Sequence, residues 1–254
     1  MKTVIVPAPG KIEIRQVETP VINAYQALVK TEMVALCNAT DSKLVAGKFP
    51  GVDTYPLALG HENAGIVVAV GEKVRNFKMG DRVIGGLISD FGAQGINSGW
   101  GGFSEYVVVN DFEVLKEEGL ATPEQGCWDS FEIQNAVPSH VQPEEAVISC
   151  TWREVLGAFK DFNLTPGKKV IVVGSGPVGL SFVKLGKLFG LGQIDIVDMH
   201  RKNGWEWPAG WGRIMDILPL KSVLRNLLPL PTVLTMRLSM RWDWMRLSIP
   251  YCHW

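Results

Sequence analysis

The sequence predicts an α/β protein in which a β-rich N-terminal part is followed by an incomplete doubly wound domain. Three observations support this fold class. Short runs of β-branched residues, separated by Gly, Pro and Asp, fill the chain up to about residue 110. A strand, a glycine-rich turn, a helix and a second strand then follow between residues 168 and 198. After about residue 200 this regular pattern ends, which leaves the doubly wound domain unfinished.

The composition is typical of a soluble globular protein. The 254 residues are 46% hydrophobic and 20% charged, and a net charge of −1 gives no attraction to a nucleic acid. No apolar run approaches the roughly 18 residues of a membrane span, and the N-terminus lacks the apolar core of a signal peptide. We therefore expect a cytoplasmic protein whose cysteines are reduced thiols or metal ligands, at positions Cys37, Cys127, Cys150 and Cys252.

The first part of the chain predicts strands with the spacing of a barrel or sandwich. They cover residues 3–8, 11–17, 26–37, 64–71, 81–86 and 103–109. Residues 111–142 have a mixed character, and their pattern does not distinguish helix, strand and loop. Residues 142–162 predict a helix, because Pro143 and two Glu stand at its start.

A glycine-rich turn predicts a dinucleotide site. A buried-type strand at 168–174 runs into "GSGPVG", and a helix follows at 177–190. Gly174 permits the tight turn, Gly176 lets the main chain approach a pyrophosphate, and Gly179 lets the helix pack closely on the strand.

The surrounding residues define the cofactor further. Pro177 and Val178 open the helix whose N-terminus would face the phosphates. Asp198 ends the next strand, 194–198, and stands 19 residues after Gly179, where a carboxylate hydrogen-bonds an adenosine ribose and disfavours a 2′-phosphate. We therefore predict NAD rather than NADP; the alternative is an ordinary glycine turn with a surface Asp.

Three residue types suited to zinc occur at separate points of the chain. Cys37 ends one predicted strand, His61 and Glu62 precede another, and Cys150 lies in the helix before the glycine turn. Two thiolates and an imidazole with an open fourth position form a catalytic zinc set. Each residue alone also fits a structural interpretation, because buried Cys residues are common in protein cores.

The segment "LGHENAGIVVAVGEKVRNFKMGDRV" resembles the medium-chain, zinc-dependent alcohol and polyol dehydrogenases, and the resemblance covers residues 1–198. It implies a GroES-like catalytic barrel at 1–145 and the first part of a Rossmann NAD-binding domain at 146–200. The resemblance also assigns site residues. Cys37, His61 and Cys150 are the implied zinc ligands, Glu62 is the carboxylate beside the metal, and the glycine turn with Asp198 is the implied cofactor site.

The chain departs from the family pattern in two places. "CNATD" places one extra residue between Cys37 and Thr40, the implied proton relay, and Lys43 replaces a His that often follows. The four-Cys lobe of many members is absent, so we expect one catalytic zinc and no structural zinc. The implied mechanism is direct. Zinc lowers the pKa of an alcohol, Thr40 passes the proton outward, and a hydride moves from the carbinol carbon to the nicotinamide.

The segment 201–254 predicts no fold and is interpreted as an aberrant tail that is out of frame. Back-translating "GWEWPAGWGRIMDI" (204–217) and shifting the frame by one base permits "LGMARRLGADHGY", which resembles the family's "LARELGAD". The same shift applied to 235–246 permits "DAxxDAVGLDA". We therefore expect a one-base frameshift between Met199 and Lys202; the alternative is a genuinely divergent C-terminus.

Two interpretations of the function remain. The first is an oxidoreductase that transfers a hydride between an alcohol or polyol and NAD(H), in a truncated, weakly active or inactive form, since the nicotinamide lies on the second half of a doubly wound domain. The second is a non-enzymatic, zinc-binding GroES-like remnant with a misfolded tail. A zinc-free reductase of the same superfamily is disfavoured by Cys37, His61 and Cys150. Intact members form homo-oligomers, and an incomplete domain would interfere with that assembly.

Overall fold

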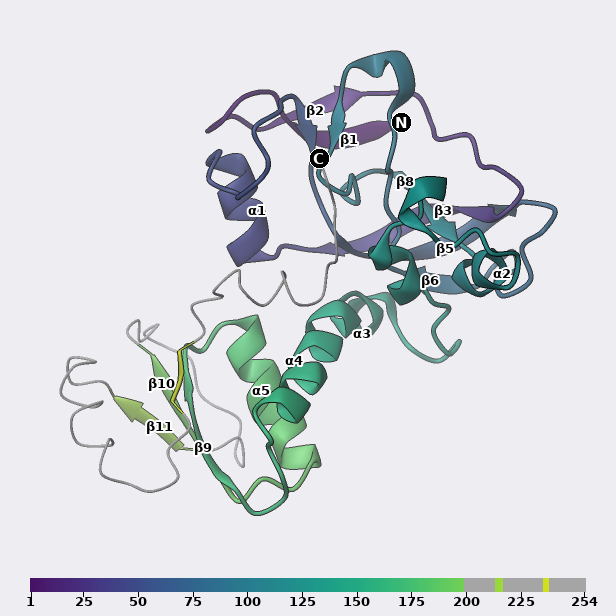
Figure 1. The fold of residues 1–254 in the computed structure, drawn as a ribbon. Helices are drawn as coiled ribbons and strands as arrows, with labels where there is room; N and C mark the ends of the chain where they lie inside the picture. The colour runs from purple at the N-terminus through teal and green to yellow at the C-terminus, as the bar shows by residue number, and fades with distance from the viewer. Residues whose placement is uncertain (199–212, 217–234, 238–254) are drawn as a thin grey trace. The chain divides into compact units, whose positions relative to one another are not determined.

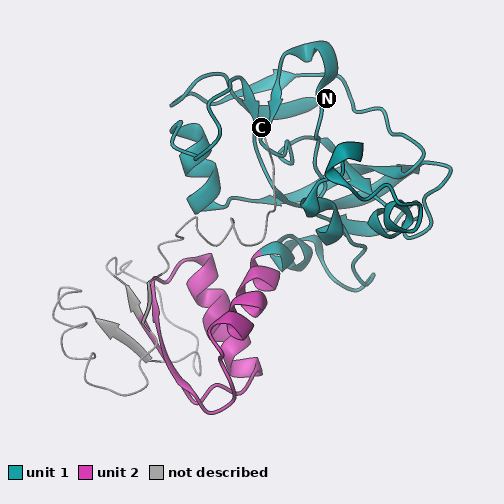
Figure 2. Cartoon of the chain, viewed as in Figure 1, with its two compact units in different colours: residues 1–150, 245–254 teal, residues 151–244 magenta. Residues whose placement is uncertain are grey.

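A computed structural model describes residues 1–198, 213–216 and 235–237 (Figure 1). The described chain divides into two compact units, unit 1 within residues 1–150 and unit 2 within residues 151–244 (Figure 2). The model is mixed α/β, with most of its strands in unit 1, which agrees with the predicted fold class. None of the helices in the described ranges is long and apolar enough to cross a membrane.

Unit 1 contains two sheets within the described residues. The first has the order β2-β1-β4-β7, formed by Glu13–Gln16, Lys2–Val6, Leu57–Ala58 and Asn97–Ser98. The second has the order β6-β5-β3-β8, formed by Arg82–Ile84, Glu62–Val70, Gln26–Ala35 and Tyr106–Asn110. Each predicted strand has a counterpart here, whereas β4 and β7 were not predicted because two-residue strands leave no alternating pattern.

One buried cluster of unit 1 lies against the second sheet. Inward-facing residues of β3, β5, β6 and β8 form a buried cluster with Phe77, namely Ala27, Val29, Val67, Val83, Val107 and Val109. The register between β3 and β5 shifts between Leu28 and Val29 and again between Thr31 and Met33. Gly65 allows the two strands to approach, because a Cβ there would lie 2.3 Å from the carbonyl oxygen of Lys30.

Short helices follow the strands of unit 1. The helix α1 (Asn38–Val45) begins directly after β3, at Cys37, and was not predicted. The stretch 111–142, to which the sequence assigned no element, contains α2 (Phe112–Glu117), η2 (Pro123–Gln125) and η3 (Asp129–Ile133). Asp111 caps α2 by accepting a hydrogen bond from the main-chain N–H of Val114. We call residues 112–133 the lobe; a further turn, η1 (Gly92–Gln94), precedes it.

The helical character predicted for 142–162 is confirmed, but a break divides the stretch into two helices. These are α3 (Pro143–Val147) and α4 (Ser149–Asp161), which are separated at Ile148. Ala146 and Val147 of α3 pack on Ala64 of unit 1. Val155 and Phe159 of α4 instead belong to the core of unit 2. The break follows from packing on two different cores, which a continuous amphipathic pattern does not indicate.

Unit 2 is built around a parallel sheet. Its described strands have the order β11-β10-β9-β12, formed by Arg213–Asp216, Gln193–Asp198, Lys169–Val173 and Thr235–Arg237. The helix α5 (Pro177–Leu188) connects β9 to β10 and, with α4, covers one face of these strands (Figure 1). The short strands β11 and β12 fall within the segment predicted to have no fold. The rest of that segment, including the proposed frameshift point, lies outside the described residues.

Candidate metal centre and cofactor turn

The metal centre begins where β3 ends. Cys37 has an extended backbone conformation and is the N-cap of α1, but its thiol makes no capping hydrogen bond. Its main-chain N–H donates to Oδ2 of Asp41 at 3.0 Å, and the N–H of Asp41 donates back to the Cys37 carbonyl at 2.9 Å. This reciprocal pair fixes the first turn of α1 and leaves the Cys37 sulfur available to a ligand.

His61 lies at the entry to β5, where it faces Asp41. Its Nδ1 is 3.6 Å from Oδ1 of Asp41, which is too long for a hydrogen bond. Both of these atoms are buried and have no hydrogen-bond partner among the described residues. A small rotation of the imidazole would let Nδ1–H donate to the carboxylate, and Nε2 would then remain for a metal.

The charges in this centre favour a thiolate beside a histidine. Burial opposes ionisation of Cys37, but hydrogen bonds with His61 and Thr40 outweigh it and lower the pKa of the thiol. Burial also opposes protonation of His61, yet the bond to Cys37 and the charge of Asp41 raise the pKa of the imidazole. Burial raises the pKa of Asp41 despite the nearby His61. A thiolate of this kind is the form of Cys that binds a metal.

The structure brings together three of the predicted ligands. One ligand atom each from Cys37, His61 and Glu62 lies within 4.8 Å of the others, and Glu62 is buried. Thr40 is buried next to them and forms a hydrogen bond with the Cys37 thiol. A sulfur, an imidazole nitrogen and a carboxylate oxygen at this spacing suit a zinc ion.

Cys150 is not part of this group. It is half-buried near the start of α4, on a helix most of which belongs to unit 2. Its assignment as a ligand rests on the family resemblance and stays a prediction. Among the described residues, Cys37, Cys127 and Cys150 form no disulfide, and Cys252 lies outside the described residues.

Sequence reasoning missed two residues of this centre. Asp41 stands four residues after Cys37 on the first turn of a helix, a spacing that could have placed its carboxylate near the ligands. Trp100 lies with its ring centroid 5.3 Å from that of His61. No sequence signal indicates that contact, because the two residues are far apart in the chain.

The glycine turn has the predicted conformation. Gly174 follows β9 with φ +107°, a value that favours glycine, and Gly176 is the N-cap of α5. A Cβ at Gly179 would lie 2.0 Å from the carbonyl oxygen of Gly174, so the third position requires glycine. A Cβ at Gly176 would meet nothing within 4 Å, which leaves that side of the turn open to a phosphate.

The remaining cofactor residues lie on the elements around the turn. Pro177 and Val178 form the first turn of α5. Asp198 is the last residue of β10, which pairs in parallel with β9. The carboxyl end of a parallel strand is where a dinucleotide ribose is bound in doubly wound folds.

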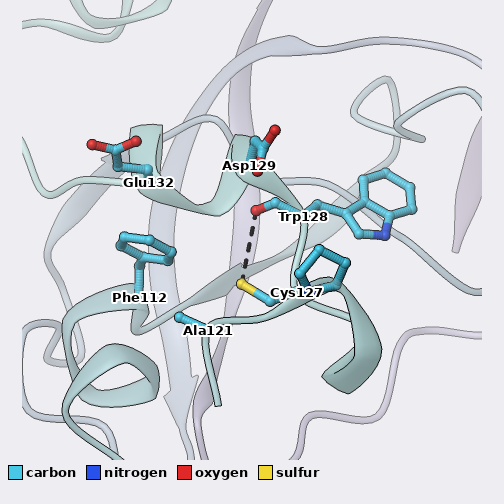
Figure 3. Close-up of a pocket in the computed structure, with 7 residues that line it drawn as sticks. Phe112, Ala121, Cys127, Trp128, Asp129 and Glu132 are labelled. Carbon is cyan, nitrogen blue, oxygen red and sulfur yellow. Dashed lines mark hydrogen bonds between the residues drawn. The ribbon is translucent and has the colours of Figure 1, made fainter. Parts of the chain in front are cut away.

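A separate pocket of about 260 Å³ lies in the lobe (Figure 3). It contains none of the predicted site residues, and its lining residues are Phe112, Ala121, Pro123, Cys127, Trp128, Asp129 and Glu132. Burial, with a smaller contribution from Asp129, raises the pKa of the Cys127 thiol, which is 3.9 Å from the carbonyl oxygen of Trp128. A thiol kept protonated in this way is a poor nucleophile, so we do not regard the pocket as a catalytic site.

Comparisons with known proteins give a consistent picture. Residues 23–118 match the model of the alcohol dehydrogenase GroES-like domain. An uncharacterized zinc-type alcohol dehydrogenase-like protein of Escherichia coli is 30% identical over 78% of this chain and 57% of its own length. The (R,R)-butanediol dehydrogenase of Bacillus subtilis is 29% identical over 74% and 55%. The chain therefore spans little more than half the length of these curated relatives.

Solved structures agree on the fold. A zinc-binding dehydrogenase from Sinorhizobium meliloti bound to NADP superposes with a TM-score of 0.61 and 26% identity, over 80% of this chain and 56% of that one. Galactitol-1-phosphate dehydrogenase from Escherichia coli superposes with a TM-score of 0.65 over 89% of this chain and 66% of that one. At 22% identity, the second likeness supports the fold alone.

Proposed function

We propose that this chain is a member of the medium-chain, zinc-type alcohol and polyol dehydrogenase family and that its site is built to transfer a hydride between an alcohol and NAD(H). The observation that carries the proposal is the convergence of Cys37, His61 and Glu62 within 4.8 Å. The glycine turn before α5 adds the cofactor half of the same chemistry.

The residues present suit one catalytic zinc ion. Cys37, His61 and Glu62 would hold it, with Cys150 as the further ligand that the family resemblance implies. When bound, zinc lowers the pKa of an alcohol hydroxyl and the nicotinamide accepts the hydride. The four-Cys segment that holds a structural zinc in many family members would lie at residues 91–106, and these residues contain no Cys.

The chain's own residues would perform the other steps. Thr40 is buried beside the Cys37 sulfur, where its hydroxyl can accept the alcohol proton and pass it outward. The open side of Gly176 and the first N–H groups of α5 would bind the pyrophosphate. Asp198 would accept hydrogen bonds from the adenosine ribose, which favours NAD over NADP. The solved structure from Sinorhizobium meliloti is bound to NADP, and titrating the chain with NADH and with NADPH tests this preference.

The function is tested by loading the purified full chain with zinc and measuring metal content, NAD(H) binding and NADH formation. Zinc in a ratio of about one per chain, together with turnover of an alcohol, would support the proposal. Bound zinc without turnover would instead favour a zinc-binding module that is not an enzyme. That alternative has support in the structure, because Cys37, His61 and Glu62 all stand in unit 1. A metal content near zero would indicate a zinc-free reductase.

We propose separately that the reading frame slips by one base between the codons of Met199 and Lys202. This proposal rests on the family-like sequence in the shifted frame, since those residues lie outside the described ones. Resequencing the gene from the codon of Gly174 to a few hundred bases beyond that of Trp254 tests it. One base gained or lost, with the other frame open, would support the slip. A confirmed frame, with an early stop in the other one, would refute it.

A further inference from the structure

An indole ring lies against the metal centre. The ring centroids of Trp100 and His61 are 5.3 Å apart with their planes tilted by 54°. On another side, Phe49 meets Trp100 edge-on at 6.0 Å and 75°. Trp100 itself is only half-buried. A large apolar surface therefore stands beside a predicted zinc ligand.

The position of Trp100 is fixed by the main chain on both sides. The N–H of Gly102 donates to the carbonyl of Gly60 at 2.7 Å, and the N–H of Phe103 donates to the carbonyl of Leu59 at 2.9 Å. The carbonyl of Trp100 accepts from the N–H of Ile88 at 2.8 Å. These bonds attach the main chain on either side of Trp100 to Ile88 and to the residues that precede His61, so the backbone of Trp100 is held close to the metal centre.

The backbone of Trp100 adopts an unusual conformation. Its φ of +71° lies in the left-handed region, which bulky residues rarely occupy. Such conformations persist only where the surrounding structure fixes them, and they concentrate at functional sites. A residue that suits this conformation, such as Asn or Gly, would hold the turn more easily. The sequence nevertheless carries the largest side chain here.

Residues of the lobe pack against the indole of Trp100. Trp100 packs against a buried cluster formed by Leu87, Cys127 and Phe131, two of which belong to the lobe. Trp128 of the lobe packs on the same cluster and stacks on Phe131 at 6.4 Å. Leu36, the residue before Cys37 in the chain, is an apolar residue that is 74% exposed.

We propose that Trp100 is a specificity-determining residue whose indole forms the apolar wall of the substrate site. The wall selects alcohols that carry an aromatic or apolar substituent on the carbinol carbon over polyols. The physical reason is that each hydroxyl of a polyol loses water against the indole without gaining a partner, whereas an aromatic or alkyl group gains contact area. This inference rests on the proposed dehydrogenase function and narrows its substrate class.

The test measures binding rather than turnover. The full chain is loaded with Co²⁺ in place of zinc, its metal content is determined, and benzyl alcohol or sorbitol is titrated while the visible absorption of the ion is recorded. We expect the wild-type chain to bind benzyl alcohol at least tenfold more tightly than sorbitol. Trp100→Asn, which suits a left-handed backbone, should lose roughly tenfold in benzyl alcohol affinity, the scale expected for one aromatic contact with its buried area.

Two further variants make the result specific. Trp100→Phe keeps a ring and should retain most of the preference. Trp128→Ala removes an indole that packs on the same cluster and stacks on Phe131, whereas the ring against His61 is that of Trp100, so this variant should leave the preference unchanged. If Trp128→Ala reduced the preference for benzyl alcohol as much as Trp100→Asn does, the proposed role of Trp100 would be contradicted, because packing of the lobe would then explain both effects.

The remaining outcomes separate the inference from the function. If the wild-type chain took up no Co²⁺, both the proposed function and the proposed role of Trp100 would be contradicted. If the chain bound Co²⁺ but the ratio of its affinities for benzyl alcohol and sorbitol were the same in the wild type and in Trp100→Asn, only the proposed role of Trp100 would be contradicted. Loss of metal in Trp100→Asn, with metal retained in Trp100→Phe, would show that the indole holds His61 in place, which also overturns the wall.

Discussion

The candidate metal centre of unit 1 and the glycine turn of unit 2 use different parts of the chain to meet their ligands. The metal centre consists of side chains that come from two elements, with Cys37 before α1 and His61 before β5. The glycine turn uses the main chain of residues 174–179. The first site therefore depends on tertiary packing, and the second on local conformation. If this contrast is correct, a substitution at one site should leave the other intact.

The largest expected effect is the loss of zinc in His61→Ala. Removing the imidazole takes away one of three converging ligands, and we expect metal content to fall from about one per chain to near zero. NADH binding, measured by fluorescence, should be unchanged. His140→Ala is the matched control, because His140 is exposed. Retention of zinc in His61→Ala would show that the centre is not built as described.

Asp41→Asn should weaken zinc binding by about 10–100-fold, as expected for an outer carboxylate that orients a histidine ligand. The carboxylate faces Nδ1 of His61 at 3.6 Å and also accepts the N–H of Cys37. Competition with a chelator measures the affinity. Asp53→Asn removes the same charge at an exposed position and should have no effect. Equal affinities in the two variants would contradict a positioning role for Asp41.

A pair of substitutions tests the glycine turn. Gly179→Ala should destabilise unit 2 by about 1–3 kcal/mol, because its Cβ would overlap the carbonyl of Gly174. Gly176→Ala should leave stability nearly unchanged but weaken NADH binding, because its Cβ would project into open space where the phosphates are expected. Thermal unfolding and NADH titration separate the two effects. Gly157→Ala is the control, since it adds a methyl to an exposed helix position.

If the glycine turn were only structural, Gly176→Ala would bind NADH as the wild type does. If it also shaped the metal centre, zinc content would fall in Gly179→Ala. Either result would break the contrast between the two sites.

The smallest expected effect is at Asp111, which joins distant segments of unit 1. Its carboxylate accepts the N–H groups of Arg75, Asn76 and Val114 and the side-chain amide of Asn76. Burial opposes its ionisation, but these bonds outweigh it and lower the pKa of Asp111. Asp111→Asn should therefore destabilise unit 1 by about 1.5 kcal/mol at pH 7.

The stability difference between the wild type and Asp111→Asn should depend on pH in a defined direction. A carboxyl with a lowered folded pKa contributes stability above its unfolded pKa of about 3.9, and the contribution is lost as the pH falls through the folded value. The stability difference between the wild type and Asp111→Asn should thus shrink below about pH 4. Denaturant unfolding at several pH values measures it. A difference that stays constant between pH 3 and pH 7 would exclude the ionised carboxylate as its source.

The parts of the fold that could be predicted are those with local causes. The β-branched runs indicated β1, β2, β3, β5, β6 and β8, and the glycine pattern indicated the turn before α5. The two-residue strands, the break at Ile148 and the helix of the lobe could not be predicted. Each of these depends on what a segment packs against. Asp111, for example, caps α2 while it binds Arg75 and Asn76 from a distant loop.

The sequence by itself determined the glycine turn, the strand pattern, and the residue types that could bind zinc and NAD. These features follow from backbone preference and side-chain chemistry, which each residue carries with it. Only the tertiary structure decided which of those residues meet. It placed His61 against Asp41 and Trp100, and it brought Cys37, His61 and Glu62 together. The reason is physical: convergence of distant side chains is set by long-range packing, which leaves no periodic trace in the sequence.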